Sequence, residues 1–556
     1  MKNLKFLIPV IAFLLYSCDE YLDVNNDPNR FLTKNVLNGQ ILPAAQAAAY
    51  TAQIFQANTL GNIFTNAWGA NVGTFGGAYV REFQLTLDNS FYPGIFQNYY
   101  IALANFQKII ESPNADHKND YYIAAAKICK AHYMQYLVDL YGDIPYTDAF
   151  KGIANTTPRY NDDQFVYRKL LGELDDARAL IAGASPLASD ITGTDIMMNG
   201  DMNKWDQFAN TIELRMLLRM SNSTGAVGAY RDARIATLST NFITDDVTIN
   251  PGYSKAADTQ MNPWVSNFGS DVNAAATQNF TLICMTGHAY KALRNYAPSN
   301  GTPVDASVSS TVVYPGVSDA RAVLLYRGTL RGVPQGGATT ATCIPSVGTP
   351  ARLGQGLFNP FGAVASPFVP ASNTNSAVYI PEFAGINGFV MTASEALLLQ
   401  AEAGLRPNFG VLGLGASVQV FFNAAIEKSY DRLGITFINP TVFPAYLTAI
   451  NAKPNFGIAA ANTFDQKLHA IMYQKWVCLL GVHGIESFIE YNRTGYPITP
   501  LASTAQKTRK PKRLIYPASE YSANSANVPN ITDPQCFAIG DPSHPFWMLG
   551  NPPLGN

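Results

Sequence analysis

The interpretation of the chain starts from one stretch, Ala124-Ala-Ala-Lys-Ile-Cys-Lys-Ala-His-Tyr-Met-Gln-Tyr-Leu-Val-Asp-Leu-Tyr-Gly-Asp-Ile-Pro-Tyr-Thr-Asp-Ala-Phe150. Its apolar residues recur every three or four positions, the spacing that places side chains along one face of a helix. These residues are Ala124, Ile128, Ala131, Met134, Val138 and Tyr141. Because Lys127, Lys130 and Asp139 fall outside this stripe, we expect an amphipathic helix with a polar side.

Two residues predict where this helix ends. Gly142 can adopt the positive φ that a helix C-terminus favours, and Pro145 cannot continue a helix. The chain should therefore turn sharply, with Tyr141, Asp143 and Tyr146 near the corner. Taken alone, the pattern is also that of a buried helix and its stop signal with no further role, since aromatic residues at helical spacing usually belong to a core.

Helical spacing recurs along much of the chain and groups into about four pairs. The pairs are 95–111 with 119–142, 162–181 with 204–220, 393–406 with 417–433, and 464–480 with 486–492, all preceded by a helix over 37–64. Pairs of this size favour a mainly α fold built from tetratricopeptide-like helical hairpins, although the strict tetratricopeptide consensus is absent.

The composition changes between about residues 222 and 387, where Gly, Pro, Ser, Thr and Asn dominate. Short runs such as 310–314 are candidate strands. The aromatic residues of this region argue against disorder, so we expect an irregular subdomain packed on the helices.

The N-terminus has the features of a lipoprotein signal peptide. Lys2 and Lys5 precede an apolar run, 6–15, that is too short to cross a bilayer as a helix. The following Leu15-Tyr-Ser-Cys18 resembles a bacterial lipobox, in which cleavage occurs before Cys18 and its thiol carries the lipid. Acyl chains bury at about 0.8 kcal/mol per methylene, so an acylated cysteine anchors a protein without a spanning helix.

Four stretches, in order along the chain, match one family. They are Ser17-Cys-Asp-Glu-Tyr-Leu-Asp-Val-Asn25 with Asn26-Asp-Pro-Asn29, Leu137-Val-Asp-Leu-Tyr-Gly-Asp-Ile-Pro-Tyr-Thr-Asp-Ala149, Gly484-Ile-Glu-Ser-Phe-Ile-Glu-Tyr-Asn-Arg-Thr-Gly-Tyr-Pro497, and Pro511-Lys-Arg-Leu-Ile-Tyr-Pro-Ala-Ser-Glu-Tyr-Ser-Ala-Asn524. On these residues the chain resembles the SusD/RagB family of outer-membrane nutrient-binding lipoproteins over almost its whole length. Asp19 and Glu20 look like the acidic export tag of surface lipoproteins in the Bacteroidetes, whereas Tyr16 is bulkier than the family norm.

The resemblance implies a fold and a function. The helical pairs would form a right-handed scaffold, and the protein would be lipid-anchored at the cell surface on the outer membrane. It would capture a glycan or oligosaccharide and act as a lid on a SusC-like TonB-dependent transporter, with no enzymatic activity. Two alternatives stay open: a peptide-binding RagB-like lipoprotein, and a surface glycoside hydrolase on a helical scaffold.

The expected domain organisation follows from these patterns. It comprises a signal peptide over 1–17, the lipidated Cys18 and a tether over 18–36, an N-terminal helical part over 37–221, a loop-rich variable ligand-binding subdomain over 222–387, a C-terminal helical part over 388–497 and an irregular segment over 498–556.

Charge and cysteine content exclude several classes of partner. The 556-residue chain has a net charge of -2 and only 14% charged residues, so it has no strong field to attract nucleic acid. Aromatic residues reach 12%, which suits neutral polyhydroxylated ligands but also the filling of a large helical core.

The six cysteines form no Cys-x-x-Cys or Cys/His cluster, which indicates neither a zinc site nor a disulfide framework. Cys129 and Cys478 lie on helical apolar runs and are expected in the core.

Motifs of catalysis are absent. There is no phosphate loop, zinc-protease helix or nucleophile elbow, so no catalytic residue, metal or cofactor is predicted. His132 is expected to be a surface histidine or a satisfied core histidine. Glycoside hydrolysis needs only two nearby carboxylates, and Glu486 and Glu490 lie four residues apart on one helix, but capping or a salt bridge with Arg493 is their expected role.

Two loops have the residue types of a sugar site, because a flat ring stacks on the apolar face of a sugar and amides pair with its hydroxyl groups. The loops run over 66–79 and 262–268. The candidate ligand-binding residues are Trp68, Asn71, Phe75 and Tyr79 in the first loop and Trp264, Asn267 and Phe268 in the second. The competing interpretation is that these rings plug the ends of helices.

Overall fold

The computed structural model describes residues 37–71, 73, 75–296, 312–337, 343–357 and 383–549. In these ranges the chain is mainly helical, and its strands are two to four residues long. No helix in these ranges combines the length and the apolar character that crossing a membrane requires. Cys18, the predicted lipidation site, lies outside the described residues.

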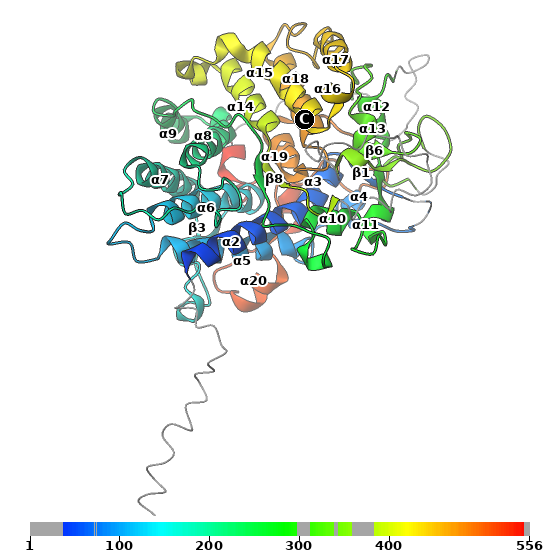
Figure 1. Cartoon of the computed structure of the whole chain (residues 1–556). Coiled ribbons are helices and arrows are strands. Elements are labelled where there is room, and N and C mark those ends of the chain that lie inside the picture. The colour runs from blue at the N-terminus through cyan, green and yellow to red at the C-terminus, as the bar shows by residue number, and fades with distance from the viewer. Residues whose placement is uncertain are drawn as a thin grey trace, which may run out of the picture.

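The N-terminal helices confirm the first predicted elements. Helix α2 (Asn38–Ala52) continues through a π-helical turn (Gln53–Ala57) into α3 (Asn58–Phe64). Helix α5 (Pro93–Ile110) packs on α2 and on α6 (Asp120–Tyr141). In Figure 1 these elements cross the lower middle of the molecule.

Helix α6 is buried around nearly its whole circumference, so the prediction that it is amphipathic is wrong. It packs against α2 and α5 and against the helices α7 and α8 described below. Lys130 and Asp139, expected to face solvent, are only 5% and 0% exposed. Both have partners inside the protein: Lys130 Nζ lies 2.7 Å from Glu173 Oε1, and Trp547 Nε1 donates to Asp139 Oδ1 at 2.9 Å.

The end of α6 is as predicted. Gly142 has φ +73° and its N–H donates to the carbonyl of Val138 at 2.9 Å. The chain then forms β2 (Ile144–Pro145), which pairs with β3 (Tyr160–Asn161). Tyr516 from the C-terminal segment fixes this corner, because its hydroxyl donates to the carbonyl of Asp143 at 2.6 Å.

The remaining predicted helices are present and pair as expected. They are α7 (Asp163–Ala182) with α8 (Met202–Arg219), α14 (Ala393–Leu405) with α15 (Val418–Arg432), and α18 (Phe464–Leu479) with α19 (Gly484–Thr494). In Figure 1, α7 and α8 lie on the left, α14, α15 and α18 at the top, and α19 near the centre, where it contacts α3.

A small antiparallel sheet joins distant parts of the chain on the other side of the molecule. Its strand order is β1 (Trp68–Ala70), β5 (Ile283–Met285), β7 (Arg352–Leu353) and β6 (Tyr326–Arg327). A separate pair joins β4 (Val247–Ile249) to β8 (Gly388–Met391). Residues 312–314, the described part of the candidate strand 310–314, are not in a strand.

Short helices complete the structure. They are α4 (Val80–Gln84), α9 (Gly225–Ile235), α10 (Pro263–Phe268), α11 (Gln278–Leu282), α12 (Gly287–Leu293), α13 (Ala322–Leu325), α16 (Ile435–Ile438), α17 (Val442–Asn451), α20 (Ala518–Ala523) and α21 (Asp533–Phe537). Helices α10 to α13 gather around the four-stranded sheet at the right of Figure 1.

The cysteines of the described chain are free thiols, and all of them are buried. They are Cys129, Cys284, Cys343, Cys478 and Cys536. Cys129 and Cys478 are 0% exposed, as their positions on apolar helical runs predict.

Candidate functional site

The four-stranded sheet brings the two predicted loops together. In the pairing of β1 with β5, Trp68 is the partner of Met285, which places the first loop beside α10. The rings of Trp68 and Phe268 have centroids 5.1 Å apart, and those of Trp264 and Phe268 are 5.2 Å apart. Residues nearly 200 positions apart therefore form one aromatic cluster.

The three rings of this cluster belong to the core, so the expectation that they are exposed is wrong. Trp68 and Phe268 are 0% exposed and Trp264 is 4% exposed. The Trp264 indole donates from Nε1 to the carbonyl of Gly481 at 2.8 Å, a bond that ties α10 to the end of α18. Short helices and strands form on both loops and turn these rings inward, which the loop-like composition did not indicate.

The two candidate asparagines bind the protein's own backbone. Asn71 is 1% exposed, and its Nδ2 donates to the carbonyl of Thr281 at 3.1 Å. Asn267 is partly exposed, and its Nδ2 donates to the carbonyl of Pro263 at 2.6 Å. The first bond ties the Asn71 loop to α11, and the second lies within α10.

Phe75 and Tyr79 are the candidate aromatic residues that reach the surface, each being partly exposed. Tyr79 has φ +56° and precedes α4. Its hydroxyl is buried without a hydrogen-bond partner, and burial, reinforced by the charge of Glu82, raises the pKa of Tyr79. No contact with a ligand is described, so the ligand-binding role of all seven candidates stays a prediction.

Sequence reasoning missed a group of arginines beside these loops. Arg327 ends β6 and Arg352 begins β7, where the two are direct partners across the strands. Arg352 Nη1 donates at 2.6 Å to the same Thr281 carbonyl that accepts from Asn71. A signal for them exists in the sequence: residues 272–381 contain six basic and two acidic residues, a net charge of +4 in a chain whose net charge is -2.

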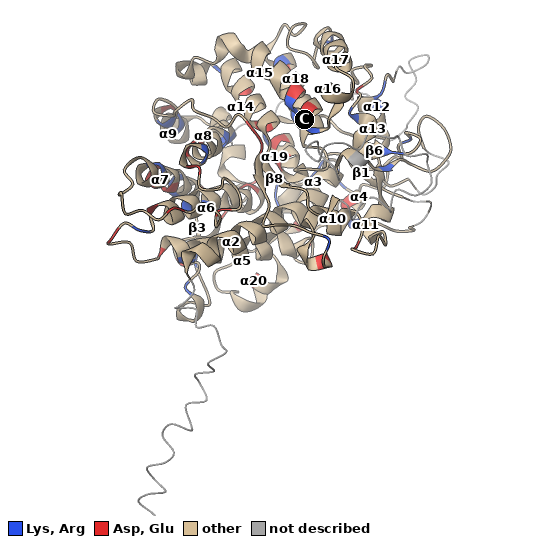
Figure 2. Ribbon diagram, viewed as in Figure 1, with Lys and Arg blue, Asp and Glu red and all other residues tan. Residues whose placement is uncertain are grey.

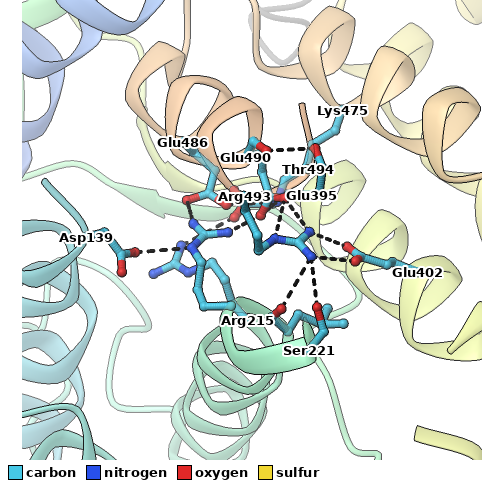
Figure 3. A network of polar contacts seen from close by, with 12 residues as sticks. Asp139, Arg215, Ser221, Glu395, Glu402, Lys475, Glu486, Glu490, Arg493 and Thr494 are labelled. Carbon is cyan, nitrogen blue, oxygen red and sulfur yellow. Dashed lines mark hydrogen bonds and ion pairs between the residues drawn. The ribbon is translucent and has the colours of Figure 1, made fainter. Parts of the chain in front are cut away.

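The carboxylates Glu486 and Glu490 are structural, as expected, and have no access to a sugar. They are 0% and 1% exposed. Glu486 pairs with Arg219 at 2.6 Å and with Lys475 at 2.8 Å. Arg493 Nε donates to Glu490 at 2.9 Å (Figure 3). Although burial favours the protonated acid, the charges of Arg219 and Lys475 outweigh it and hold the pKa of Glu486 well below its usual range.

The ion pairs of Glu486 and Glu490 belong to a larger buried network of polar side chains, which extends through α8 to α6 and α14. Arg215 Nη2 lies 3.0 Å from Nδ1 of His132, and Arg215 pairs with Glu395 at 3.3 Å. Arg493 also pairs with Glu402 at 2.6 Å (Figure 3). Burial lowers the pKa of His132 well below its usual value, and the charge of Arg215 adds to this effect. His132 is thus a core histidine held neutral, and the network connects the helical pairs.

An acidic cluster lies at the corner after α6. Carboxylate oxygens of Asp143, Asp162 and Asp163 come within 4.8 Å of one another, a donor set suited to a hard cation such as Ca²⁺. The N–H of Asp163 donates to Asp143 at 3.0 Å, and the N–H of Phe546 donates to Asp163 at 2.6 Å. Burial raises the pKa of Asp163 to about 7, with the charges of Asp143 and Asp162 adding to it. Backbone N–H groups thus donate to the carboxylates of Asp143 and Asp163 in this cluster.

Two family models match consecutive parts of the chain. The model described as "Starch-binding associating with outer membrane" matches residues 32–285. The model described as "Susd and RagB outer membrane lipoprotein" matches residues 371–536. Together they account for most of the chain. No curated protein sequence matches it.

Solved structures of SusD homologues have the same fold. A chitin-binding homologue from Flavobacterium johnsoniae is 20% identical with a TM-score of 0.62, covering 92% of this chain and 99% of its own. A homologue from Parabacteroides distasonis is 18% identical with a TM-score of 0.67, covering 93% and 99%. One from Bacteroides uniformis is 18% identical with a TM-score of 0.60, covering 91% and 99%. The family models and the fold agree over the length of the molecule: the chain belongs to the SusD/RagB family of outer-membrane lipoproteins.

Proposed function

We propose that this protein is a glycan-binding lipoprotein on the cell surface, which captures oligosaccharides and delivers them as a lid to a SusC-like TonB-dependent transporter. The observation that carries the proposal is the match of both family models, whose descriptions name starch binding and the outer membrane. The description of one structural neighbour as chitin-binding supports the same ligand class. The anchor is the lipid on Cys18.

The proposed role is binding without catalysis. The best-placed helical carboxylate pair, Glu486 and Glu490, is buried and occupied by Arg219, Lys475 and Arg493, which supports this view. The candidate contact residues are the partly exposed Phe75, Tyr79 and Asn267, held by the buried Trp68, Asn71, Trp264 and Phe268.

A glycan panel tests the proposal. The soluble protein, starting at residue 19, is incubated with chitin, starch and acidic polysaccharides, and with a peptide mixture. Retention of a glycan in unchanged form is the expected result. Release of shorter products would identify a hydrolase, and retention of peptides alone would identify a RagB-like peptide binder. Co-purification of the lipidated protein with an outer-membrane transporter tests the lid role.

A further inference from the structure

Three arginines near the four-stranded sheet have no carboxylate partner within the part of the chain that the structure describes. They are Arg327, Arg331 and Arg352, all partly exposed. The one acidic residue of the described positions between 272 and 357, Asp319, is bound to Arg321 at 2.7 Å. Together with Lys291 and Arg294, these arginines account for the region's excess of positive charge, and Figure 2 shows blue segments beside β6.

The geometry of Arg327 and Arg352 keeps two like charges together. They face each other directly in the β6–β7 pair, an arrangement that is destabilising when both residues carry the same charge. The guanidinium of Arg327 lies over the ring of Phe280, with Cζ 4.0 Å from the ring centroid. Its Nε is buried and has no hydrogen-bond partner.

The surroundings of Arg327 and Arg352 add to the free-energy cost of keeping both side chains charged. Burial lowers the pKa of Arg327 to about 10, and the charge of Arg352 contributes to the decrease. Burial also lowers the pKa of Arg352. A cation that is partly desolvated without a counter-charge is unfavourable unless a ligand supplies one.

Elsewhere four buried arginines have a carboxylate partner, whereas the buried Arg432 and Arg513 donate to backbone carbonyls and have no carboxylate within ion-pair distance in the described chain. Arg215, Arg219, Arg321 and Arg493 each have a carboxylate oxygen within 3.3 Å. The sheet arginines differ from these four in two ways: they are partly exposed, and one of them, Arg352, lies beside the Asn71 loop through the shared Thr281 carbonyl. They are placed where a ligand at that loop would meet them.

We propose that Arg327 and Arg352 bind the carboxylate or sulfate group of an acidic oligosaccharide. A guanidinium presents paired N–H donors that match the two oxygens of such a group. This inference rests on the proposed glycan-binding function and narrows its substrate class to anionic glycans.

The test compares acidic probes with matched neutral ones by calorimetric titration. The probes are hexagalacturonate with its neutral methyl ester, and a chondroitin sulfate tetrasaccharide with its desulfated and carboxyl-reduced form. Wild-type protein should bind an acidic probe at least about tenfold more tightly than its neutral match, as a charge-assisted paired hydrogen bond allows. Arg327→Gln and Arg352→Gln should each remove most of this preference.

A melting experiment provides an independent readout and a folding control. Sodium sulfate should raise the unfolding midpoint of wild-type protein more than that of Arg327→Gln when both are measured at the same ionic strength. The reason is that a ligand stabilises the state that binds it. The midpoint of Arg327→Gln without anion should be unchanged or raised, since one of two like charges is removed. Arg159→Gln is the matched control, because Arg159 is 75% exposed and pairs with Asp148 elsewhere.

The outcomes separate the two proposals. Equal binding of acidic and neutral glycans, unaffected by Arg327→Gln, would overturn the anion site and leave glycan binding intact. Failure to bind any glycan would overturn the proposed function and this inference with it. Arg327-dependent binding of a tetra-aspartate peptide in place of every acidic glycan would reassign the arginines to peptide recognition and overturn the glycan assignment.

Discussion

The indole of Trp68 is among the largest fully buried side chains of the protein, and it packs against Phe268 in the aromatic cluster between β1 and α10. Trp68→Ala should therefore lower the free energy of unfolding by about 3 to 5 kcal/mol, the usual cost of emptying a buried tryptophan site. Thermal unfolding of the soluble protein measures this. Phe437→Ala is the control, because that ring is 75% exposed and its loss should change the midpoint little. An unchanged midpoint for Trp68→Ala would return this residue to the surface site predicted from the sequence.

Lys510 predicts a pH dependence of stability. It is 3% exposed, and burial together with the charge of Lys512 lowers its pKa to about 7. Between pH 7 and 10.5 the unfolded chain holds a proton on this lysine that the folded protein has released, so the free energy of unfolding rises with pH in that window.

The test is denaturant unfolding at pH 7 and pH 9. The wild-type gain over this interval should exceed that of Lys510→Met by on the order of 2 kcal/mol, since each unit of pKa shift corresponds to about 1.4 kcal/mol. Lys169→Met, at an exposed position on α7, should keep the wild-type dependence. Identical pH dependence in Lys510→Met would show that Lys510 stays charged in the folded protein.

The residue types in the sequence were a better guide to which side chains cluster than to which side chains are exposed. The tryptophans and asparagines of the two loops do converge, but Trp68 and Asn71 are buried because strand β1 pairs with β5, more than 200 residues away. Such pairing depends on contacts that no local spacing encodes. The arginines Arg327 and Arg352 were missed because strands of two residues leave no periodic signal.

At the level of single elements, the stop signal of α6 is the most testable. Gly142 has φ +73°, and a Cβ there would lie 3.1 Å from the carbonyl oxygen of Ser543. Gly142→Ala should therefore cost about 1 to 3 kcal/mol of unfolding free energy, from backbone strain and crowding. Gly172→Ala is the matched control and should have the opposite effect on the unfolding free energy. Gly172 lies within α7, and a Cβ there would meet open space, so alanine should stabilise the protein by about 0.5 to 1 kcal/mol. Equal effects of the two substitutions, compared by denaturant unfolding, would contradict the cap.

The ion-pair network between helices predicts acid sensitivity. Arg219 contacts Asp139 on α6 and Glu486 on α19, all 0% exposed. The pKa of Glu486 is depressed in the folded state, so Glu486 contributes stability above about pH 4.5 that is lost as the pH falls through its folded pKa. Arg219→Met leaves buried carboxylates without their cation and should cost about 3 to 5 kcal/mol at pH 7.

The difference between wild type and Arg219→Met should shrink at pH 4, where the orphaned carboxylates take up protons. Denaturant unfolding at both pH values measures it, with the exposed Arg159→Gln as the control. A difference that is the same at pH 7 and pH 4 would mean that Arg219 acts through packing alone.

The helices were predictable because their apolar spacing and their stop signals are local. The burial of α6 was not, since its polar residues find partners only after α7, α8 and the C-terminal segment are in place. A usable clue exists in the charged residues spaced four apart on otherwise apolar helices, such as Arg215 with Arg219 and Glu486 with Glu490. Such pairs fit an internal ion-pair network as well as a solvated face.

For the whole molecule, the resemblance in four motifs led directly to the family, and the helical scaffold follows from it. The anchor is testable through Cys18, which lies outside the described residues. Cys18→Ala should abolish labelling with radioactive palmitate and release the protein from the outer membrane, because it removes the thiol proposed to carry the lipid. Ser17→Ala is the control and should leave both unchanged. A Cys18→Ala protein that stays labelled and membrane-bound would show that the anchor lies elsewhere.

The reactivity of the buried thiols reports local unfolding of the protein. Burial raises the pKa of Cys129, Cys284 and Cys536, so a thiol reagent reacts with them only in molecules that have transiently exposed these sites. They lie in α6, β5 and α21, and Cys478 lies in α18. The order in which mass spectrometry detects their modification would rank the local stabilities of the helical core, the sheet and the C-terminal segment.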